Sequence, residues 1–137
     1  MIIRSFDSQT LSERIVENSH LDVGFNVEQW LNNQDNIFIK NGDDCALFEK
    51  VAEGIYEGHY LFSSATRGQK ALDLATDILE DFFITYSPNY IRGLVPKGDR
   101  KTSWLTRKVG FVYFGDISTP YGDCELFLLS NPLKRNN

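Results

Sequence analysis

The sequence is poor in the residues that cross-link chains or bind metals. Its two cysteines, Cys45 and Cys124, are far apart and have no CxxC partner, so we expect reduced thiols in a cytoplasmic protein. Its two histidines, His20 and His59, are not at ligand spacing from a cysteine or from each other, which argues against a zinc site. The amino terminus lacks a signal-peptide hydrophobic region, and no apolar run is long enough to span a bilayer. These absences predict a protein without zinc and without a membrane segment.

The chain does have enough apolar residues for one packed core. Its 137 residues fit a single domain, 1–137, and 42% of them are hydrophobic and 13% aromatic, which is typical of a folded protein. The net charge is −5. The segment Lys97–Lys108 holds five basic residues and one acidic residue, a local charge of +4, so the remainder carries −9. An acidic chain is a poor general nucleic-acid binder, and we expect this segment to bind a local anion or to form a solvated helix face.

Apolar periodicity and turn signals predict an alternation of strands and helices. A strand at Ile2–Phe6 leads into a helix with an apolar stripe at Leu11 and Ile15, and a second short helix is predicted around Phe25–Leu31. Turn residues at positions 41–44 and 52–54 predict an antiparallel meander of three strands, Asn36–Lys40, Cys45–Val51 and Ile55–Phe62.

The longest helix is indicated by apolar residues that repeat every three and four positions from Ala71 to Phe83. A Ser-Pro-Asn sequence at residues 87–89 ends it. Two kinds of element follow: a helix from about Asp99 to Lys108, and the strands Tyr90–Val95, Phe111–Ile117 and Cys124–Leu129. The last two strands are predicted to form a hairpin. An exposed terminal strand can pair with a second chain, so the pattern leaves a homo-oligomer open.

The junction between the strand Ile55–Phe62 and the long helix is the most informative segment. The chain enters the helix through Arg67-Gly68-Gln69-Lys70-Ala71. A helix that begins directly after a strand points its unpaired N–H groups beyond the sheet edge, and Arg67 and Lys70 add positive charge there. This order suggests a pocket for a phosphate-bearing cofactor.

The order of elements resembles that of the GNAT superfamily of acyl-CoA N-acyltransferases over nearly the whole chain. The segment 67–72 resembles the cofactor motif of that family, and the segment Asp99–Phe111 resembles a later motif that opens on Asn and closes on Gly-Phe. The resemblance implies an α/β (α+β) fold with a mixed, mostly antiparallel sheet of about seven strands and helices on both faces. It also implies acetyl-CoA as cofactor and direct transfer of the acetyl group to an amine, on a small molecule or a protein.

The resemblance assigns cofactor binding to the strand end, the turn and the starts of two helices: Phe62, Ser63, Arg67, Gly68, Gln69, Lys70, Ala71 and Asp99. Backbone N–H groups around Phe62 and Ser63 would hold the thioester carbonyl. Lys70 and Leu72 stand where the family prefers small residues that let the helix backbone approach the pyrophosphate. Lys70 therefore either binds a phosphate or fills the place of the cofactor.

Direct acyl transfer also needs a base for the amine and an acid for the leaving thiolate. Glu57 and His59 lie two residues apart on one strand and share a face, so they could act as an acid–base pair or form an exposed polar face. Thr106 stands where many family members have a Tyr that protonates the thiolate, and an aliphatic hydroxyl is too weak an acid for this role. Tyr113, Tyr90 or water could replace it.

The departures from the family motifs favour an alternative function. They lie at Lys70, Leu72, Asp99 and Thr106. A catalytically inert GNAT-like protein would act by binding a protein partner in a structural or host-interaction role, and GNAT-like proteins of tailed bacteriophages, some of them virion-associated, are similar in size. A nucleic-acid module built on Lys97–Lys108 is disfavoured by the acidic remainder. The sequence thus predicts a cytoplasmic N-acetyltransferase, with an inert binding protein, in the cytoplasm or a phage virion, as the alternative.

Overall fold

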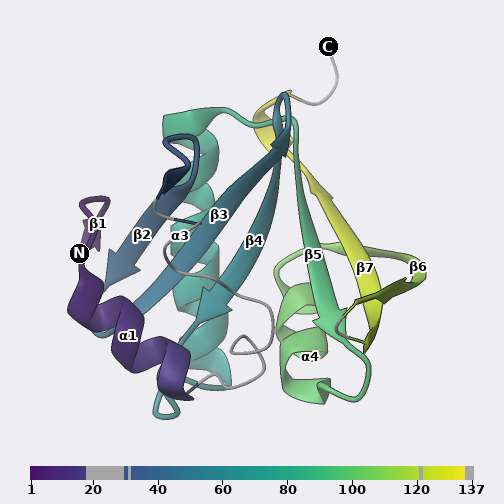
Figure 1. Ribbon diagram of the computed structural model, residues 1–137, viewed down its shortest axis with the longest axis horizontal. Helices are drawn as coiled ribbons and strands as arrows, with labels where there is room; N and C mark the ends of the chain where they lie inside the picture. The colour runs from purple at the N-terminus through teal and green to yellow at the C-terminus, as the bar shows by residue number, and fades with distance from the viewer. Residues whose placement is uncertain (18–29, 31, 121, 135–137) are drawn as a thin grey trace.

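The chain folds around one mixed β-sheet (Figure 1). The structure is a computed structural model that describes residues 1–17, 30, 32–120 and 122–134. These residues form a sheet of seven strands in the order β1-β2-β3-β4-β5-β7-β6. Every neighbouring pair is antiparallel except β4 and β5, which run parallel. The predicted α+β architecture with a mixed, mostly antiparallel sheet is confirmed.

Most elements lie close to their predicted positions. The strands are β1 (Ile2–Ile3), β2 (Ile37–Asn41), β3 (Asp44–Ala52), β4 (Ile55–Leu61), β5 (Tyr90–Pro96), β6 (Val112–Thr119) and β7 (Gly122–Ser130). The helices are α1 (Ser8–Glu17), α3 (Gln69–Tyr86) and α4 (Arg100–Lys108). The predicted strand Ile2–Phe6 is wrong at its carboxyl end, because Arg4 pairs with Asp81 of α3 and Asp7 caps α1. The helix predicted around Phe25–Leu31 lies largely outside the described residues.

Helices cover both faces of the sheet, as predicted (Figure 1). The ring of Phe82 in α3 stacks on Phe48 of β3 with 3.9 Å between the centroids. On the other face, Leu11 of α1 is buried in a cluster with Leu47 of β3. Because successive strand residues point to opposite faces, β3 is covered from both sides and most of it is buried. No helix within the described ranges is long and apolar enough to cross a membrane.

The feature that positions the site is the separation of β4 from β5. The two strands pair only over three rungs, from Ile55 with Tyr90 to Glu57 with Arg92, and then diverge (Figure 1). Beyond these rungs β5 continues to pair with β7 as far as Pro96. The carboxyl-terminal half of β4 therefore does not pair with β5 and instead borders an opening in the sheet.

The two faces of β4 carry different chemistry. Leu61 packs into the cluster under α1, and Glu57 and His59 share its face because alternate residues point the same way. Tyr56 packs against the core that α3 covers, and Tyr60 packs beside α3 and α4. Acidic and imidazole groups thus lie on one side of the opening, and aromatic groups lie on the other.

Candidate functional site

Two adjoining cavities occupy the opening between β4 and β5. The larger has a volume of about 640 Å³ and lies between the two strands, the start of α4 and the β6–β7 turn. The smaller has a volume of about 500 Å³ and lies between the β4–α3 loop and the starts of α3 and α4. Tyr60 and Thr102 line both. The cavities therefore adjoin at these two residues, and we call the two together the crevice; the larger cavity is lined from both faces of the sheet.

The charged residues that line the two cavities have opposite signs. The smaller cavity, which we call the basic pocket, is lined by Arg67, Arg100 and Lys101, and no described carboxylate lines it. The larger cavity, which we call the acidic cavity, is lined by Glu49, Glu57 and Asp123, and no described lysine or arginine lines it. The crevice thus runs from a positive end to a negative end.

The basic pocket includes the start of α3. The N-cap residue is Gly68, whose φ of 61° suits glycine, and no side chain caps the helix. The first N–H groups of α3 are therefore left without a side-chain acceptor. Of the predicted cofactor-binding residues, five line this pocket, namely Phe62, Ser63, Arg67, Gly68 and Ala71. Arg100 and Lys101 also line it, and sequence reasoning had noted them only as part of a basic segment.

The other three predicted cofactor-binding residues lie off the lining of both cavities. The Gln69 side chain donates to Asp73 at 2.8 Å along the surface of α3. Lys70 is exposed and does not line the pocket, so it does not fill the place predicted for a cofactor. The carboxylate of Asp99 accepts the Thr102 backbone N–H at 3.1 Å and its hydroxyl at 2.7 Å, so Asp99 caps α4. Binding roles for these three residues stay predictions without a supporting contact.

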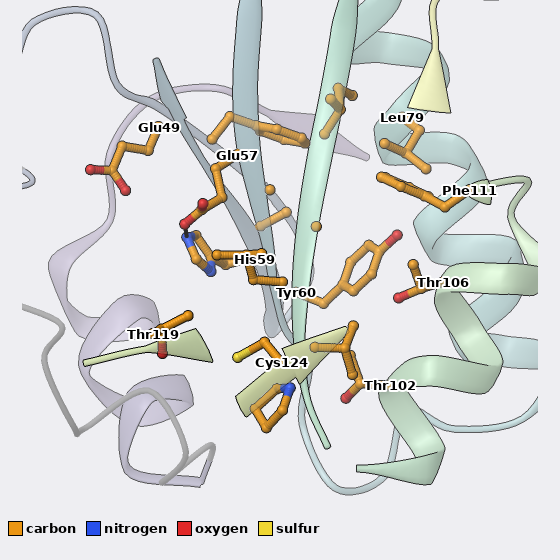
Figure 2. Close-up of a pocket in the computed structure, with 18 of the residues that line it drawn as sticks. Glu49, Glu57, His59, Tyr60, Leu79, Thr102, Thr106, Phe111, Thr119 and Cys124 are labelled. Carbon is orange, nitrogen blue, oxygen red and sulfur yellow. Dashed lines mark ion pairs between the residues drawn. The ribbon is translucent and has the colours of Figure 1, made fainter. Parts of the chain in front are cut away.

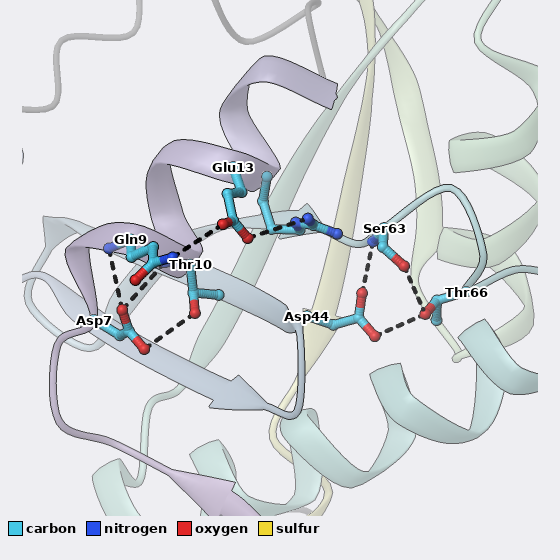
Figure 3. A network of polar contacts seen from close by, with 8 residues as sticks. Asp7, Gln9, Thr10, Glu13, Asp44, Ser63 and Thr66 are labelled. Carbon is cyan, nitrogen blue, oxygen red and sulfur yellow. Dashed lines mark hydrogen bonds and ion pairs between the residues drawn. The ribbon is translucent and has the colours of Figure 1, made fainter.

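A buried aspartate holds the loop that leads into α3 (Figure 3). Asp44 accepts the Ser63 backbone N–H at 2.6 Å and the Thr66 hydroxyl at 2.7 Å. The Ser63 N–H thus has an acceptor within the protein, which argues against its predicted role of holding a thioester carbonyl. Sequence reasoning treated Asp44 as a turn residue, because nothing local signals a partner 19 positions away.

Glu57 and His59 lie in contact and are largely buried, rather than forming an exposed polar face. Their side chains are 12% and 16% exposed, and Nε2 of His59 lies 3.2 Å from the Glu57 carboxylate. Arg92, from the last paired rung of β5, donates to the same carboxylate at 2.9 Å. Burial raises the pKa of Glu57, but the hydrogen bond from His59 and the charges of His59 and Arg92 outweigh it, so the pKa lies below its ordinary value. Glu57 is therefore ionised at neutral pH.

Glu49 joins this pair across the sheet. It lies opposite Glu57 in the β3–β4 register, and ligand atoms of Glu49, Glu57 and His59 all lie within 4.8 Å of one another. Three such groups could hold a metal ion, a possibility that spacing along the chain did not reveal. Two of the three are already paired with each other, and Arg92 also binds Glu57.

Tyr60 is the tyrosine that the fold places in the crevice. Its hydroxyl is buried and has no hydrogen-bond partner among the described residues, and burial raises its pKa. Figure 2 shows the hydroxyl on the side of Thr106 and Phe111, away from His59. The sequence-based candidates Tyr113 and Tyr90 are exposed and line neither cavity, and Tyr113 donates to Asp116 at 2.7 Å. No signal in the sequence singles out Tyr60 among the tyrosines.

Sequence comparisons find no matching family model and no matching curated protein. Solved structures do match. A point mutant of the spermidine N-acetyltransferase SpeG from Vibrio cholerae has a TM-score of 0.74 at 12% identity, covering 99% of this chain and 98% of that one. A ribosomal-protein alanine acetyltransferase from Vibrio fischeri scores 0.62 at 12% identity, covering 89% and 71%. A GNAT-family acetyltransferase from Bacillus anthracis scores 0.59 at 16% identity, covering 70% and 66%.

These likenesses establish the class of fold. The chain has the fold of the GNAT acetyltransferases, as the resemblance in its sequence predicted. The likeness covers the backbone alone, and the charges on the crevice walls are set by this sequence.

Proposed function

We propose that the protein is an acetyl-CoA-dependent N-acetyltransferase that transfers an acetyl group to an amine by direct attack. The observation that carries the proposal is the pair of adjoining cavities, one lined by cations and the other by carboxylates. Coenzyme A carries phosphates at one end and its thioester at the other, so a basic pocket adjoining a proton-accepting pair fits its chemistry. The acetyltransferases with the same fold support this function.

The residues present fit an anionic cofactor. Arg67, Arg100, Lys101 and the N–H groups in the first turn of α3 would hold its phosphates. The Tyr60 hydroxyl, buried without a partner where the two cavities adjoin, needs a hydrogen-bond acceptor that a ligand could supply. Acetyl-CoA, when bound, supplies the activated acetyl group.

The proton chemistry falls to the acidic cavity. His59 is the group that takes the proton of the attacking amine, and the ionised Glu57 carboxylate facing its Nε2 stabilises the imidazolium that results. Arg92 fixes the other oxygen of Glu57 and so orients the pair. Tyr60 keeps its proton at neutral pH because burial raises its pKa, so its hydroxyl can donate a hydrogen bond into the crevice. Thr106 is buried nearby and lines the same cavity.

We propose a cytoplasmic location and a small-molecule or protein amine as acceptor. One observation favours the alternative role in protein binding. The edge strand β6 exposes Val112 by 59% and Phe114 by 63%, and an edge strand offers unpaired backbone groups to a protein partner or a second copy. The structures named above come from Vibrio and Bacillus, and they give no support to a bacteriophage or virion origin.

The test is thermal melting with and without acetyl-CoA and free CoA, followed by CoA release with a panel of amines. We expect the cofactor to raise the Tm by several degrees at saturating concentration. Arg67→Ala and Gly68→Glu should remove the shift, because they delete a cation and add a carboxylate at the basic pocket. Lys108→Ala, an exposed cation outside the pocket, is the matched control. No shift at millimolar cofactor, with no CoA release, would overturn the proposal.

A further inference from the structure

We propose that two copies of the chain associate by antiparallel pairing of their β6 strands, with Phe114 of each copy opposite Gly115 of the other. The two seven-stranded sheets would then form one continuous sheet across a two-fold axis. Pairing of this kind goes beyond the proposed activity and does not depend on it. Of the residues of β6, only Thr119 lines a cavity of the crevice.

The first argument is the unprotected edge of β6. It is the outermost strand of the sheet and has eight residues, whereas β1 at the opposite edge has two. Proteins usually protect an edge strand with lysine, proline or an unpaired charge. β6 contains no lysine, arginine or proline, and its one charged residue, Asp116, is paired with Lys97 at 2.5 Å. The outer backbone groups of β6 face no described strand and are available for pairing.

The second argument is an apolar patch along β6, formed by Val112, Phe114 and Ile117, which we call the edge patch. These side chains are 59%, 63% and 38% exposed. Tyr113, which lies between two of them, is opposite Phe127 of the core that α3 covers, so the edge patch lies on the face away from α3. On that face α1 packs on β3 and β4, at the opposite end of the sheet from β6 (Figure 1). The edge patch of a second copy, placed beside this one, would cover it.

The third argument is a β-bulge that a second copy of β6 matches. Tyr113 and Gly115 pair with consecutive residues of β7, so Phe114 is an extra residue in β6. A regular strand added to the outer edge would be out of step by one residue beyond the bulge. A second β6, related by a two-fold axis between Phe114 and Gly115, carries its own extra residue at the same place. The bulge thus favours a second copy of this chain over a regular strand of another protein.

The fourth argument is that the faces of the two β6 strands agree in this register. Directly opposite residues of two strands share a face of the sheet. Val112 and Ile117 would be opposite each other, and they share one face because they pair with residues 128 and 124 of β7. Tyr113 and Asp116 would also be opposite, and they share the other face because they pair with residues 127 and 125. A shift of one residue would put Tyr113 opposite Gly115 or Ile117, which lie on the wrong face.

The opposed side chains are also chemically complementary. The Tyr113 hydroxyl donates to Asp116 within one chain at 2.7 Å, so the same donor and acceptor would meet across the axis. Phe114 would cover Gly115, and an aromatic ring opposite a glycine stabilises a strand pair. A register centred on Asp116 would instead oppose two carboxylates, which repel each other. Complementarity of this kind selects the register centred between Phe114 and Gly115.

Sedimentation velocity of the wild-type protein over a range of concentrations tests the association. We expect twice the mass of one chain at micromolar concentration. Phe114→Lys puts two lysines beside the axis and should weaken the dimer at least on the order of tenfold, without lowering the Tm of the monomer because the side chain is exposed. Ile84→Lys, at an exposed position of α3, is the matched control and should leave the dimer intact. A wild-type protein that stays monomeric at millimolar concentration, or a dimer that Phe114→Lys leaves unchanged, would overturn the inference.

Disulfide trapping tests the register. The background is Cys124→Ser, because Cys124 lies opposite Ile117 within one chain. In it, Val112→Cys combined with Ile117→Cys should give a covalent dimer on oxidation, since the two positions would face each other across the axis. Tyr113→Cys combined with Ile117→Cys is the control and should stay uncross-linked, because these positions lie on different faces of β6. Cross-linking of the control pair alone, or of neither pair, would contradict this register and the inference with it.

Discussion

The basic pocket and the acidic cavity share Tyr60 and Thr102, yet different kinds of chemical group line them. The basic pocket uses the backbone at the start of α3 and three cationic side chains, Arg67, Arg100 and Lys101. The acidic cavity uses side chains that are paired before any ligand arrives, with Glu57 bound to both His59 and Arg92. The first arrangement suits the anion binding that we propose, whereas the second fixes the proposed proton acceptor in one orientation.

The sheet keeps these two tasks apart. The basic pocket lies on the face that α3 and α4 cover, because residues from the starts of both helices line it. Glu57 and His59 lie on the opposite face, and the larger cavity connects the two through the opening between β4 and β5. This arrangement would let the proposed cofactor and the proposed amine acceptor enter from opposite faces and meet in the opening.

The largest effect should come from breaking the buried cluster of the acidic cavity. Arg92→Ala leaves the largely buried Glu57 carboxylate with His59 alone. Because the Arg92 side chain is itself 39% exposed, solvent screens part of the contact, and we expect a loss of about 1.5–3 kcal/mol of unfolding free energy. Urea unfolding measures this. Lys108→Ala, which removes an exposed cation, should change the value by less than about 0.5 kcal/mol. Equal losses for the two variants would mean that the Arg92–Glu57 contact adds nothing to stability.

A smaller effect is expected from the loop of the basic pocket. Asp44→Ala removes the acceptor of the Ser63 N–H and the Thr66 hydroxyl, and unsatisfied buried groups cost about 1–3 kcal/mol. It should also weaken acetyl-CoA binding, because the loop then no longer positions Arg67. The neighbouring exposed residue provides the control, Asp43→Ala, which should affect neither. Unfolding and the cofactor-induced Tm shift are the two measurements, and an unchanged shift would separate Asp44 from the pocket.

The difference between the two cavities also explains why the basic pocket was easier to predict from the sequence than the acidic cavity. The start of α3 is local information, since a strand followed by a glycine-containing turn and a helix leaves its N–H groups exposed wherever it occurs. The motif, however, was taken as a continuous run. A helix turns about 100° per residue, so Gly68 and Ala71 line the pocket while Gln69 and Lys70 lie elsewhere.

Of the acidic cavity, only the residues that lie close together in the sequence were predicted. Glu57 and His59 were recognised because strand alternation puts them on one face. Glu49 and Arg92 come from other strands, and Arg92 is 35 positions from the carboxylate that it binds. Their placement depends on strand register, and register is decided by the packing of the whole sheet rather than by any short segment.

A substitution at Tyr60, which lines both cavities, tests whether the place where they adjoin binds a ligand. Tyr60→Phe removes a buried hydroxyl that has no partner, so it should leave unfolding free energy unchanged or raise it by about 1 kcal/mol. The same change should reduce the Tm shift caused by acetyl-CoA, because a ligand in the crevice would lose a hydrogen-bond donor. Tyr90→Phe, at an exposed position, should do neither. A loss of stability in Tyr60→Phe without ligand would show that the hydroxyl is already paired within the protein.

The smallest effect concerns the pH dependence of stability that Glu57 confers. Its pKa in the folded protein lies below the ordinary value of 4.5, despite burial, because His59 and Arg92 favour the carboxylate. The folded state then binds fewer protons at Glu57 than the unfolded state does. The stabilisation is present above about pH 4.5 and is lost as the pH falls through the folded pKa. Urea unfolding between pH 3 and pH 7 should show this component in the wild type and not in Glu57→Gln. Parallel curves for the two proteins would mean that the paired carboxylate does not favour the folded state in this range.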